Sequence, residues 1–425
     1  MTIPELYKIY QQHPKVFTDS RLLKPNAIFF ALKGDNFNGN QFALKALEGG
    51  AAYAVVDEDL HAKDERIIRV PDVLTTLQQL AKHHRQQFGI PFIAITGSNG
   101  KTTTKELLHA VLQTSFKTYT TKGNLNNHIG IPITLLEIGS DAEMAVIEMG
   151  ANHRHEIEGY CKYAMPTHGL ITNCGKAHLE GFGGEEGVRK GKGELLQYLA
   201  SRKGVAFAFD DYDYMHQMVA DVEKVIWYGT EKGFITGATI KNEPFLSVEI
   251  RDTTQSFIIN TQLVGSYNLP NVLAAVAVGK YFDVSNQKIT SAIASYSPSN
   301  SRSQLMDWNG NKLILDAYNA NPTSMRAAIE NMAAIKGDSK VLMLGAMMEL
   351  GDESVKEHQE IVELIAKHSW KEVALVGGDF LKITHPYLSF RNAAEAAEWF
   401  KRKGFQNHYI LIKGSRSMKM EQVLS

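Results

Sequence analysis

The sequence predicts an α/β protein of three domains with mainly parallel sheets. Short apolar strands alternate with helical patterns from about residue 89 to about 297, and the alternation resumes after residue 303. A glycine-rich turn between an apolar strand and a helix lies at residues 96–104. Strands that alternate with helices favour parallel sheets covered by helices. A chain of 425 residues is long enough for two to four domains.

The N-terminal domain is expected over residues 1–88. It contains an apolar strand pattern at 26–32, a helix-like stretch at 41–47 and a short strand at 52–56. A helical pattern over 73–87 leads into the next domain.

The central domain, expected over 89–297, opens on a candidate phosphate-binding loop. A buried strand is predicted at 91–96 and a helix at 105–112, and the residues between them are polar or glycine. Backbone N–H groups of such a turn surround an anion. Lys101 adds a positive charge for the β- and γ-phosphates, and Thr102 adds a hydroxyl for Mg²⁺. The candidate nucleotide-binding residues are Thr96, Gly97, Ser98, Asn99, Gly100, Lys101, Thr102 and Thr103.

The loop departs from the usual pattern, which would place a glycine at Ile95. A purely structural turn is the alternative. Because a Gly-Lys-Thr sequence follows a buried strand here, nucleotide binding is the preferred interpretation.

Polar side chains follow two further strands of this domain. Glu148 ends an apolar strand at 145–148, and its carboxylate could hold Mg²⁺ opposite Thr102. A helix N-cap or a surface acid is the alternative for Glu148. His178 follows the strand at 169–172 and is a candidate for a second metal ion, although a lone histidine is usually structural or exposed. Ligands of parallel sheets gather beyond the carboxyl ends of the strands.

The C-terminal domain is expected over residues 298–425. The polar stretch at 298–303 marks its start. An apolar helix at 268–281 precedes this boundary. The predicted strands of the C-terminal domain lie at 313–315, 341–344, 373–376 and 409–412.

The composition excludes several classes of protein. Lys plus Arg is 45 and Asp plus Glu is 46, a balance that gives no electrostatic signature of nucleic-acid or membrane binding. No apolar run has transmembrane length, and the N-terminus lacks a secretory signal pattern. Cys161 and Cys174 are expected to be buried small residues in a reducing, cytoplasmic setting. Two histidine pairs are interpreted as solvated side chains rather than metal ligands: His83 with His84, and His153 with His155.

These motifs together resemble the ATP-dependent Mur ligases. The resemblance spans nearly the whole chain and rests on the loop at 96–103 followed by Glu148, His178 and Lys192. The segment 123–132 resembles the family's segment after the ATP loop. Five further segments resemble the branch of the family that adds D-alanyl-D-alanine: 19–21, 34–42, 148–152, 316–322 and 413–416.

The resemblance implies an ATP-dependent amide ligase of peptidoglycan precursor synthesis. Such an enzyme joins D-alanyl-D-alanine to UDP-N-acetylmuramoyl-tripeptide through an acyl phosphate, with two Mg²⁺ ions. It further implies a uridine-nucleotide-binding first domain, an ATP-binding second domain and a Rossmann-like third domain that binds the dipeptide. A monomer is expected. The third residue of the tripeptide, lysine or a diaminopimelate, is left open.

The resemblance also assigns roles to individual residues. Lys192 aligns with a lysine that the family carbamylates; with His178 and Glu148 it would support the second Mg²⁺. Lys190 is the competitor for this role. The implied catalytic residues are Lys101, Glu148, His178 and Lys192, and the implied metal ligands are Thr102, Glu148, His178 and Lys192. Nucleotide contacts are implied for Asn271, Arg302 and Asp316, and substrate contacts for Ser20, Arg21, Asn319, Asn321 and Lys413.

The chain departs from the family pattern at five positions. Tyr267 stands where histidine is usual, and Ala346 where aspartate is usual. Asn38 and Asn40 replace an aspartate and a histidine, and Ser301 replaces a glycine. None of these is a predicted metal or phosphate ligand, so the departures bear on adenine and substrate contacts.

Three other functions remain as alternatives. Folylpolyglutamate synthetase shares the loop but lacks a dedicated N-terminal domain. The ligase that adds the third stem-peptide residue has such a domain but different neighbours around its Asn-Pro motif. A P-loop regulator or motor would hydrolyse ATP without an amino-acid acceptor.

Overall fold

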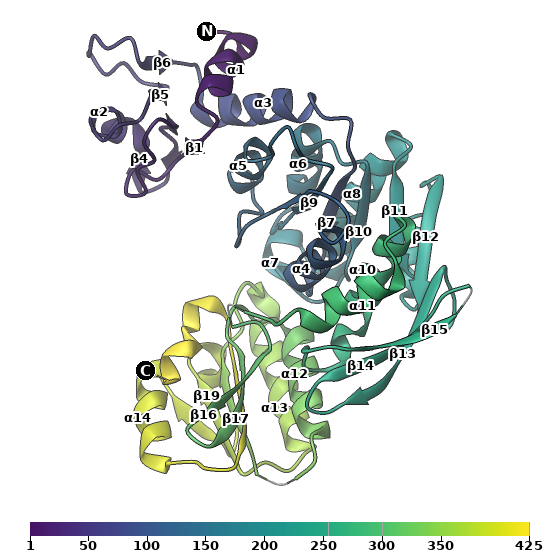
Figure 1. Ribbon diagram of the computed structural model, residues 1–425. Helices are drawn as coiled ribbons and strands as arrows, with labels where there is room; N and C mark the ends of the chain where they lie inside the picture. The colour runs from purple at the N-terminus through teal and green to yellow at the C-terminus, as the bar shows by residue number, and fades with distance from the viewer. Residues whose placement is uncertain (254, 300, 338, 425) are drawn as a thin grey trace.

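The computed structural model describes residues 1–253, 255–299, 301–337 and 339–424. Residue 300, within the predicted boundary stretch at 298–303, lies outside the described residues. The chain passes through three α/β bodies in succession, drawn from purple through teal to yellow in Figure 1. Each body is built on its own main sheet, of four, nine and six strands. The predicted α/β class with mainly parallel sheets is confirmed, whereas the boundaries at 88 and 297 stay predictions.

The N-terminal domain has a four-stranded parallel sheet in the order β1-β2-β5-β6. The strands expected at 26–32 and 52–56 correspond to its two buried central strands, β2 and β5. The elements are α1 Ile3–Gln12, β1 Val16–Phe17, β2 Ile28–Phe30, β3 Lys33–Gly34, β4 Phe37–Asn38, η1 Gly39–Phe42, α2 Ala43–Glu48, β5 Tyr53–Val56, β6 Ile67–Arg69 and α3 Val73–Arg85.

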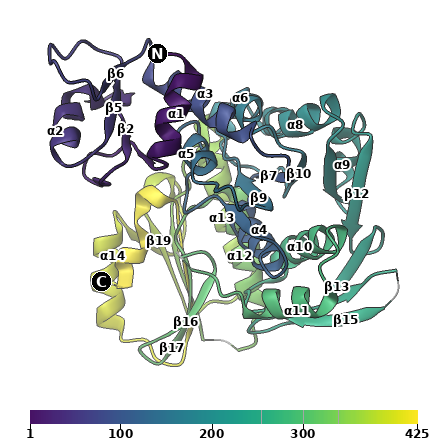
Figure 2. The same cartoon turned by 45° about the horizontal axis from the view of Figure 1, so that its top comes forward.

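Helix α3 joins the N-terminal domain to the central one, and it lies between them in both views (Figures 1 and 2). The His84 ring contacts the Tyr7 hydroxyl at 3.0 Å and the carbonyl of Ile138 at 2.9 Å. Arg85 donates to the carbonyls of Ala164 and Met165. The prediction that the pair at 83–84 is solvated is therefore wrong for the second histidine, which is only 7% exposed. Its burial comes from a contact between domains, which local sequence does not reveal.

The central domain is a nine-stranded sheet in the order β15-β14-β13-β12-β11-β10-β7-β9-β8. Its strands are parallel except for the β13-β14 and β14-β15 pairs at one edge. The elements are β7 Phe92–Thr96, α4 Lys101–Leu112, β8 Thr118–Thr120, α5 Gly130–Leu136, β9 Met144–Glu148, α6 Glu156–Ala164, β10 His168–Ile171, α7 Leu179–Phe182, α8 Glu185–Ser201, β11 Val205–Phe209, α9 Asp213–Met218, β12 Lys224–Gly229, β13 Ile235–Asn242, β14 Leu246–Arg251, β15 Ser256–Asn260, η2 Ser266–Asn268, α10 Leu269–Tyr281 and α11 Asn286–Ser295.

The C-terminal domain has a six-stranded sheet in the order β16-β17-β21-β18-β19-β20, in which only the β16-β17 pair is antiparallel. All four predicted strands are present as β17, β18, β19 and β21. The elements are β16 Gln304–Trp308, β17 Asn311–Asp316, α12 Pro322–Ala334, β18 Lys340–Gly345, η3 Gly351–Glu353, α13 Ser354–Ala366, β19 Glu372–Val376, η4 Gly378–Lys382, β20 Leu388–Phe390, α14 Ala393–Lys403, β21 Tyr409–Lys413, η5 Arg416–Met418 and η6 Met420–Leu424.

Two further expectations concern the whole chain. Within the described ranges, no helix combines the length and the apolar character needed to cross a membrane. Both cysteines are buried free thiols, as predicted. Burial raises the pKa of the Cys174 thiol to about 12, so this side chain behaves as a small apolar residue.

Candidate active site

A cleft of about 1070 Å³ lies between the central and C-terminal domains. The ends of β7, β9 and β10 form one wall, and α12 with the ends of β17 and β21 forms the other. No residue of 1–88, a range described without gaps, lines it. The predicted substrate residues Ser20 and Arg21 are therefore outside this cleft, and Arg21 is paired with Asp19 at 2.7 Å.

Two glycines give the phosphate loop its shape. Gly97 has φ +144° and Gly100 has φ +79°, which side chains rarely adopt. A Cβ on Gly97 would lie 2.0 Å from Oγ1 of Thr172, and one on Gly100 would lie 2.6 Å from Oδ1 of Asn271. Both positions therefore admit only glycine, and the loop is tightly held although position 95 is not a glycine.

Helix α4 begins at Lys101, directly after Gly100 as its N-cap. The prediction that the helix starts at residue 105 is wrong by one turn. Three consecutive threonines lower helix propensity locally and obscured this start. Because α4 begins at Lys101, its first turn presents free N–H groups to the cleft.

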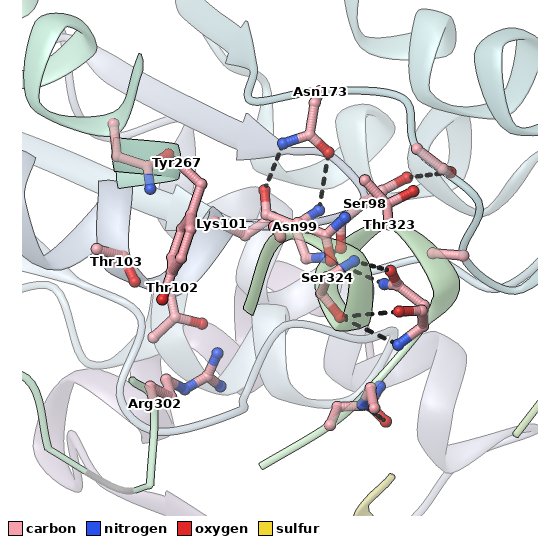
Figure 3. A pocket seen from close by; sticks show the side chains of 18 of the residues that line it. Ser98, Asn99, Lys101, Thr102, Thr103, Asn173, Tyr267, Arg302, Thr323 and Ser324 are labelled. Carbon is pink, nitrogen blue, oxygen red and sulfur yellow. Dashed lines mark hydrogen bonds between the residues drawn. The ribbon is translucent and has the colours of Figure 1, made fainter. Parts of the chain in front are cut away.

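The residues that follow β10 form hydrogen bonds to the phosphate loop. Oγ of Ser98 donates to the carbonyl of Gly175 at 2.9 Å, and the backbone N–H of Asn99 donates to Oδ1 of Asn173 at 3.0 Å. The Thr172 hydroxyl donates to the carbonyl of Asn99 at 2.6 Å. The Asn173 contacts are visible in Figure 3. These bonds fix the loop to the neighbouring strand before any ligand arrives.

The Lys101 side chain folds back over its own loop. Its Nζ donates to the carbonyls of Gly97 at 2.6 Å and Ser98 at 3.3 Å. Burial, assisted by the charge of Arg302, lowers the pKa of Lys101. A cation held at the mouth of the loop is placed to attract phosphate oxygens.

Thr102 and Glu148 lie together as predicted. The Thr102 hydroxyl is 2.9 Å and 3.1 Å from the two carboxylate oxygens of Glu148. Asn126 donates to the same carboxylate at 2.8 Å, and Glu148 is only 1% exposed. A hydroxyl and a carboxylate at this separation are the hard oxygen ligands that Mg²⁺ prefers, so the donor set fits that ion.

His178 is the N-cap of α7, with φ +53°. Its Nδ1 lies 2.6 Å from Oε2 of Glu349, a residue of the C-terminal domain that sequence reasoning missed. The contact lacks hydrogen-bond alignment. It lowers the pKa of the Glu349 carboxyl. Glu349 has φ +63°, so two strained residues meet across the cleft.

Lys192 lies inside the protein on α8, whereas its competitor Lys190 is exposed. Nζ of Lys192 donates to the carbonyl of Ala151 at 2.9 Å, and the side chain is 1% exposed. Burial above all, then the charge of Lys101, lowers the pKa of Lys192 to about 7. Lys190 instead pairs with Glu186 on its own helix at 2.6 Å.

No cluster of three His, Cys, Asp or Glu side chains suited to a metal exists among the described residues. The predicted set contains only two such residues, Glu148 and His178, beside Thr102 and Lys192.

The predicted nucleotide contacts lie along the same cleft. Oδ1 of Asn271 accepts a hydrogen bond from Thr104 at 3.0 Å, and its Nδ2 donates to Asn268 at 2.9 Å. The Arg302 guanidinium is 3.6 Å from the centre of the Tyr318 ring. Figure 3 shows Arg302 facing the start of α4.

The C-terminal domain contributes a second polar cluster. Nζ of Lys413 donates to Oδ2 of Asp316 at 2.6 Å and to the carbonyl of Asn319 at 3.3 Å. Nδ2 of Asn321 donates to Oδ1 of Asn99 at 2.7 Å and so reaches the phosphate loop directly. Together with Arg302, all five predicted site residues of this domain thus line the cleft.

Some departures from the family pattern have physical explanations. Ala346 is fully buried, and it packs so closely on Gly378 that a Cβ on Gly378 would lie 2.4 Å from the Cβ of Ala346. Ser301 has φ +56°, a conformation that suits the glycine of the family pattern. Asn40 bonds to Asp57 through both its amide atoms.

Comparison with known proteins gives consistent results along the chain. The model described as "Mur ligase family, catalytic domain" matches residues 15–85, "Mur ligase middle domain" matches 95–279, and "Mur ligase, glutamate ligase domain" matches 301–416. The UDP-N-acetylmuramoyl-tripeptide--D-alanyl-D-alanine ligase of Bacillus subtilis (strain 168) is 34% identical, over 96% of this chain and 92% of that protein.

Comparison with solved structures gives the same family. A crystal structure of MurF from Acinetobacter baumannii superimposes with a TM-score of 0.90 at 30% identity, over 100% of this chain and 97% of that one. MurF from Thermotoga maritima in complex with ADP gives a TM-score of 0.87 at 26% identity, over 97% and 96% of the two chains.

Proposed function

Since this chain belongs to the Mur ligase family, we propose that it joins D-alanyl-D-alanine to UDP-N-acetylmuramoyl-tripeptide and converts ATP to ADP and phosphate. The ligase of Bacillus subtilis that is 34% identical over nearly the full length carries this activity in its name. The product is a precursor of peptidoglycan. The observation that carries the proposal is the shared cleft, in which the phosphate loop faces Asn321 and Lys413 of the C-terminal domain.

The reaction needs an activated carboxylate, because a free carboxylate is a poor electrophile. ATP transfers its γ-phosphoryl group to the tripeptide carboxylate, which gives an acyl phosphate and ADP. The amine of D-alanyl-D-alanine then attacks the carbonyl carbon, loses a proton, and expels phosphate. The peptide bond forms as the carbon–oxygen bond to phosphate breaks.

The residues of the phosphate loop bind and orient the nucleotide in this proposal. N–H groups at the start of α4 and the Lys101 ammonium stabilise charge on the transferred phosphoryl group. Asn271 and Arg302 are proposed to contact the nucleoside. Both residues line the cleft.

Thr102 and Glu148 are proposed to hold a Mg²⁺ ion, and Glu148, His178 and Lys192 a second. When bound, these ions would neutralise phosphate charge during the transfer. The oxygen atoms of Thr102 and Glu148 already lie within 3.1 Å of each other.

Lys192 is proposed to carry a carbamate. Its ammonium loses one proton to give the neutral amine, which adds CO₂ and releases a second proton, so that a cationic side chain becomes an anionic oxygen donor. An ordinary lysine, with a pKa of about 10.4, is almost wholly protonated at neutral pH. Burial that lowers the pKa of Lys192 to about 7 supplies the neutral amine that this addition requires.

The N-terminal domain is proposed to bind the uridine nucleotide, with Ser20 and Arg21 among its contacts. Arg21 pairs with Asp19 and its side chain is highly exposed, so its guanidinium is accessible to a phosphate. Asn319, Asn321 and Lys413 are proposed to face the dipeptide. A monomer is proposed as the catalytic unit.

Phosphate release from ATP tests the function. Release is expected only when UDP-N-acetylmuramoyl-tripeptide and D-alanyl-D-alanine are both present, and mass spectrometry is expected to show a UDP-linked pentapeptide. Phosphate release that is independent of the dipeptide would instead favour an ATP-hydrolysing regulator. Parallel reactions with the lysine- and diaminopimelate-containing tripeptides identify the preferred acceptor.

A further inference from the structure

Tyr267 forms a hydrogen bond across the cleft between the central and C-terminal domains. It lies in η2, immediately before α10, and its hydroxyl donates to Oγ of Ser303 at 3.0 Å. Ser303 belongs to the C-terminal domain, one residue before β16. Figure 3 shows the Tyr267 ring extending from the central domain past Thr103 toward Arg302. The bond therefore joins the nucleotide side of the cleft to the first residues of the third domain.

The backbone around this tyrosine is built to place its ring. Gly265 has φ +92°, and a Cβ there would lie 2.2 Å from Cε1 of Tyr267. Ser303 itself has φ +48°, which is uncommon for a residue with a side chain. Burial raises the pKa of the Tyr267 hydroxyl, which keeps it protonated and able to donate.

The contact continues into the C-terminal domain through Asp316. The backbone N–H of Ser303 donates to Oδ1 of Asp316 at 3.0 Å, and Nζ of Lys413 donates to Oδ2 at 2.6 Å. Lys413 is only 2% exposed. One oxygen of the Asp316 carboxylate thus accepts from Ser303, the residue that Tyr267 contacts. The other oxygen accepts from the buried ammonium of Lys413 at the cleft.

We propose that Tyr267 is a positioning residue that couples the nucleotide side of the cleft to the dipeptide side, through Ser303, Asp316 and Lys413. It fixes the start of the third domain against the central domain and thereby fixes the carboxylate that orients Lys413. This role rests on the proposed function, because Lys413 acts there on the dipeptide. Tyr267 itself does not touch the reacting atoms.

Steady-state phosphate release by the full-length enzyme tests the coupling. With ATP and UDP-tripeptide saturating, Tyr267→Phe is expected to raise the KM for D-alanyl-D-alanine about two- to tenfold, the effect of one hydrogen bond. The kcat and the KM for ATP are expected to change less than about twofold. A tyrosine that served only to stabilise the fold would not change one KM selectively.

Ser303→Ala and the double variant complete the test. Ser303→Ala is expected to reproduce the rise in the dipeptide KM, and the double variant is expected to be no worse than either single variant. Tyr281→Phe is the matched control: Tyr281 ends α10 and accepts a hydrogen bond from Lys224 at 3.0 Å, away from the cleft. Its kinetic constants are expected to equal those of the wild type.

Two results would overturn the inference. Independent, multiplying effects of Tyr267→Phe and Ser303→Ala would show that the pair is not coupled. A rise in the KM for ATP with an unchanged KM for the dipeptide would show a nucleotide contact only. Wild-type enzyme that releases phosphate without any dependence on the dipeptide would refute the proposed function as well, so the two failures are distinguishable.

Discussion

Asn321 of the C-terminal domain donates a hydrogen bond from Nδ2 to Oδ1 of Asn99 in the phosphate loop, at 2.7 Å and across 222 residues of sequence. Its own Oδ1 accepts from the backbone N–H of Ser324 at 2.9 Å and caps α12. The side-chain amide of Asn321 therefore has two roles, one for its nitrogen and one for its oxygen. It starts a helix of the third domain and fastens that helix to the ATP-binding loop.

Replacement of Asn321 by serine separates these tasks. Serine is a good N-cap, so the melting temperature is expected to stay near that of the wild type. The amide donor is lost, and kcat/KM for ATP is expected to fall about two- to tenfold. Asn321→Ala loses the cap as well and is expected to melt several degrees lower. A serine variant with unchanged ATP kinetics would show that the Asn99 contact is not used in turnover.

Gly97→Ala is expected to destroy nucleotide binding. Its Cβ would lie 2.0 Å from Oγ1 of Thr172, and φ +144° disfavours any side chain, so the loop must move away from β10. We expect at least a hundredfold weaker binding of ADP in calorimetry, with the far-ultraviolet circular dichroism unchanged.

The control for this variant is Gly89→Ala. No atom lies within 4 Å of a Cβ at that position, and the residue is exposed. Its ADP affinity is expected to match the wild type. Equal ADP binding by Gly97→Ala and Gly89→Ala would contradict the assigned role of the loop.

The strand framework was predictable because each central strand is a continuous apolar segment. All five residues of β7 are buried, as are all five of β9, which is typical of parallel strands covered on both faces. Strand β13, which pairs with β12 and β14, mixes buried and exposed positions and was not predicted. Its pattern resembles that of a polar loop, since one face is open to solvent.

Contacts between domains could not be predicted from the residues alone. Nothing local indicates that Glu349 reaches His178 or that Tyr267 reaches Ser303, because those pairs depend on how two folded domains sit together. The pairing of Thr102 with Glu148 was predictable, since adjacent parallel strands bring their carboxyl ends to one edge.

Lys192→Ala is expected to lower turnover at least about a hundredfold, because a metal-supporting group is lost. Lys190→Ala is the matched control on the same helix, since Lys190 is exposed and pairs with Glu186 on that helix. In ¹³CO₂-saturated buffer, a carbamate carbon signal is expected in the wild type and in Lys190→Ala, but not in Lys192→Ala. A signal that survives in Lys192→Ala, or full activity of that variant at low CO₂, would contradict the carbamate.

His168, at the start of β10, is expected to make stability depend on pH. Burial above all lowers its pKa from 6.5 to about 4, and its ring packs against Phe207, Tyr281 and Phe282. The unfolded chain therefore binds a proton more readily than the folded one. The stabilisation is complete above pH 6.5 and is lost as the pH falls toward 4, by about 2 kcal/mol between pH 7 and pH 5.

Chemical unfolding of the wild type and of His168→Phe at pH 7 and pH 5 measures this loss. Phenylalanine keeps the aromatic contacts but cannot take up a proton, so the variant is expected to lose about 2 kcal/mol less than the wild type between the two pH values. Replacement of His155, whose side chain is 71% exposed, is expected to leave the wild-type slope unchanged. If the phenylalanine variant and the wild type lose stability in parallel, protonation of His168 is not the cause, because every other titrating group is common to both proteins.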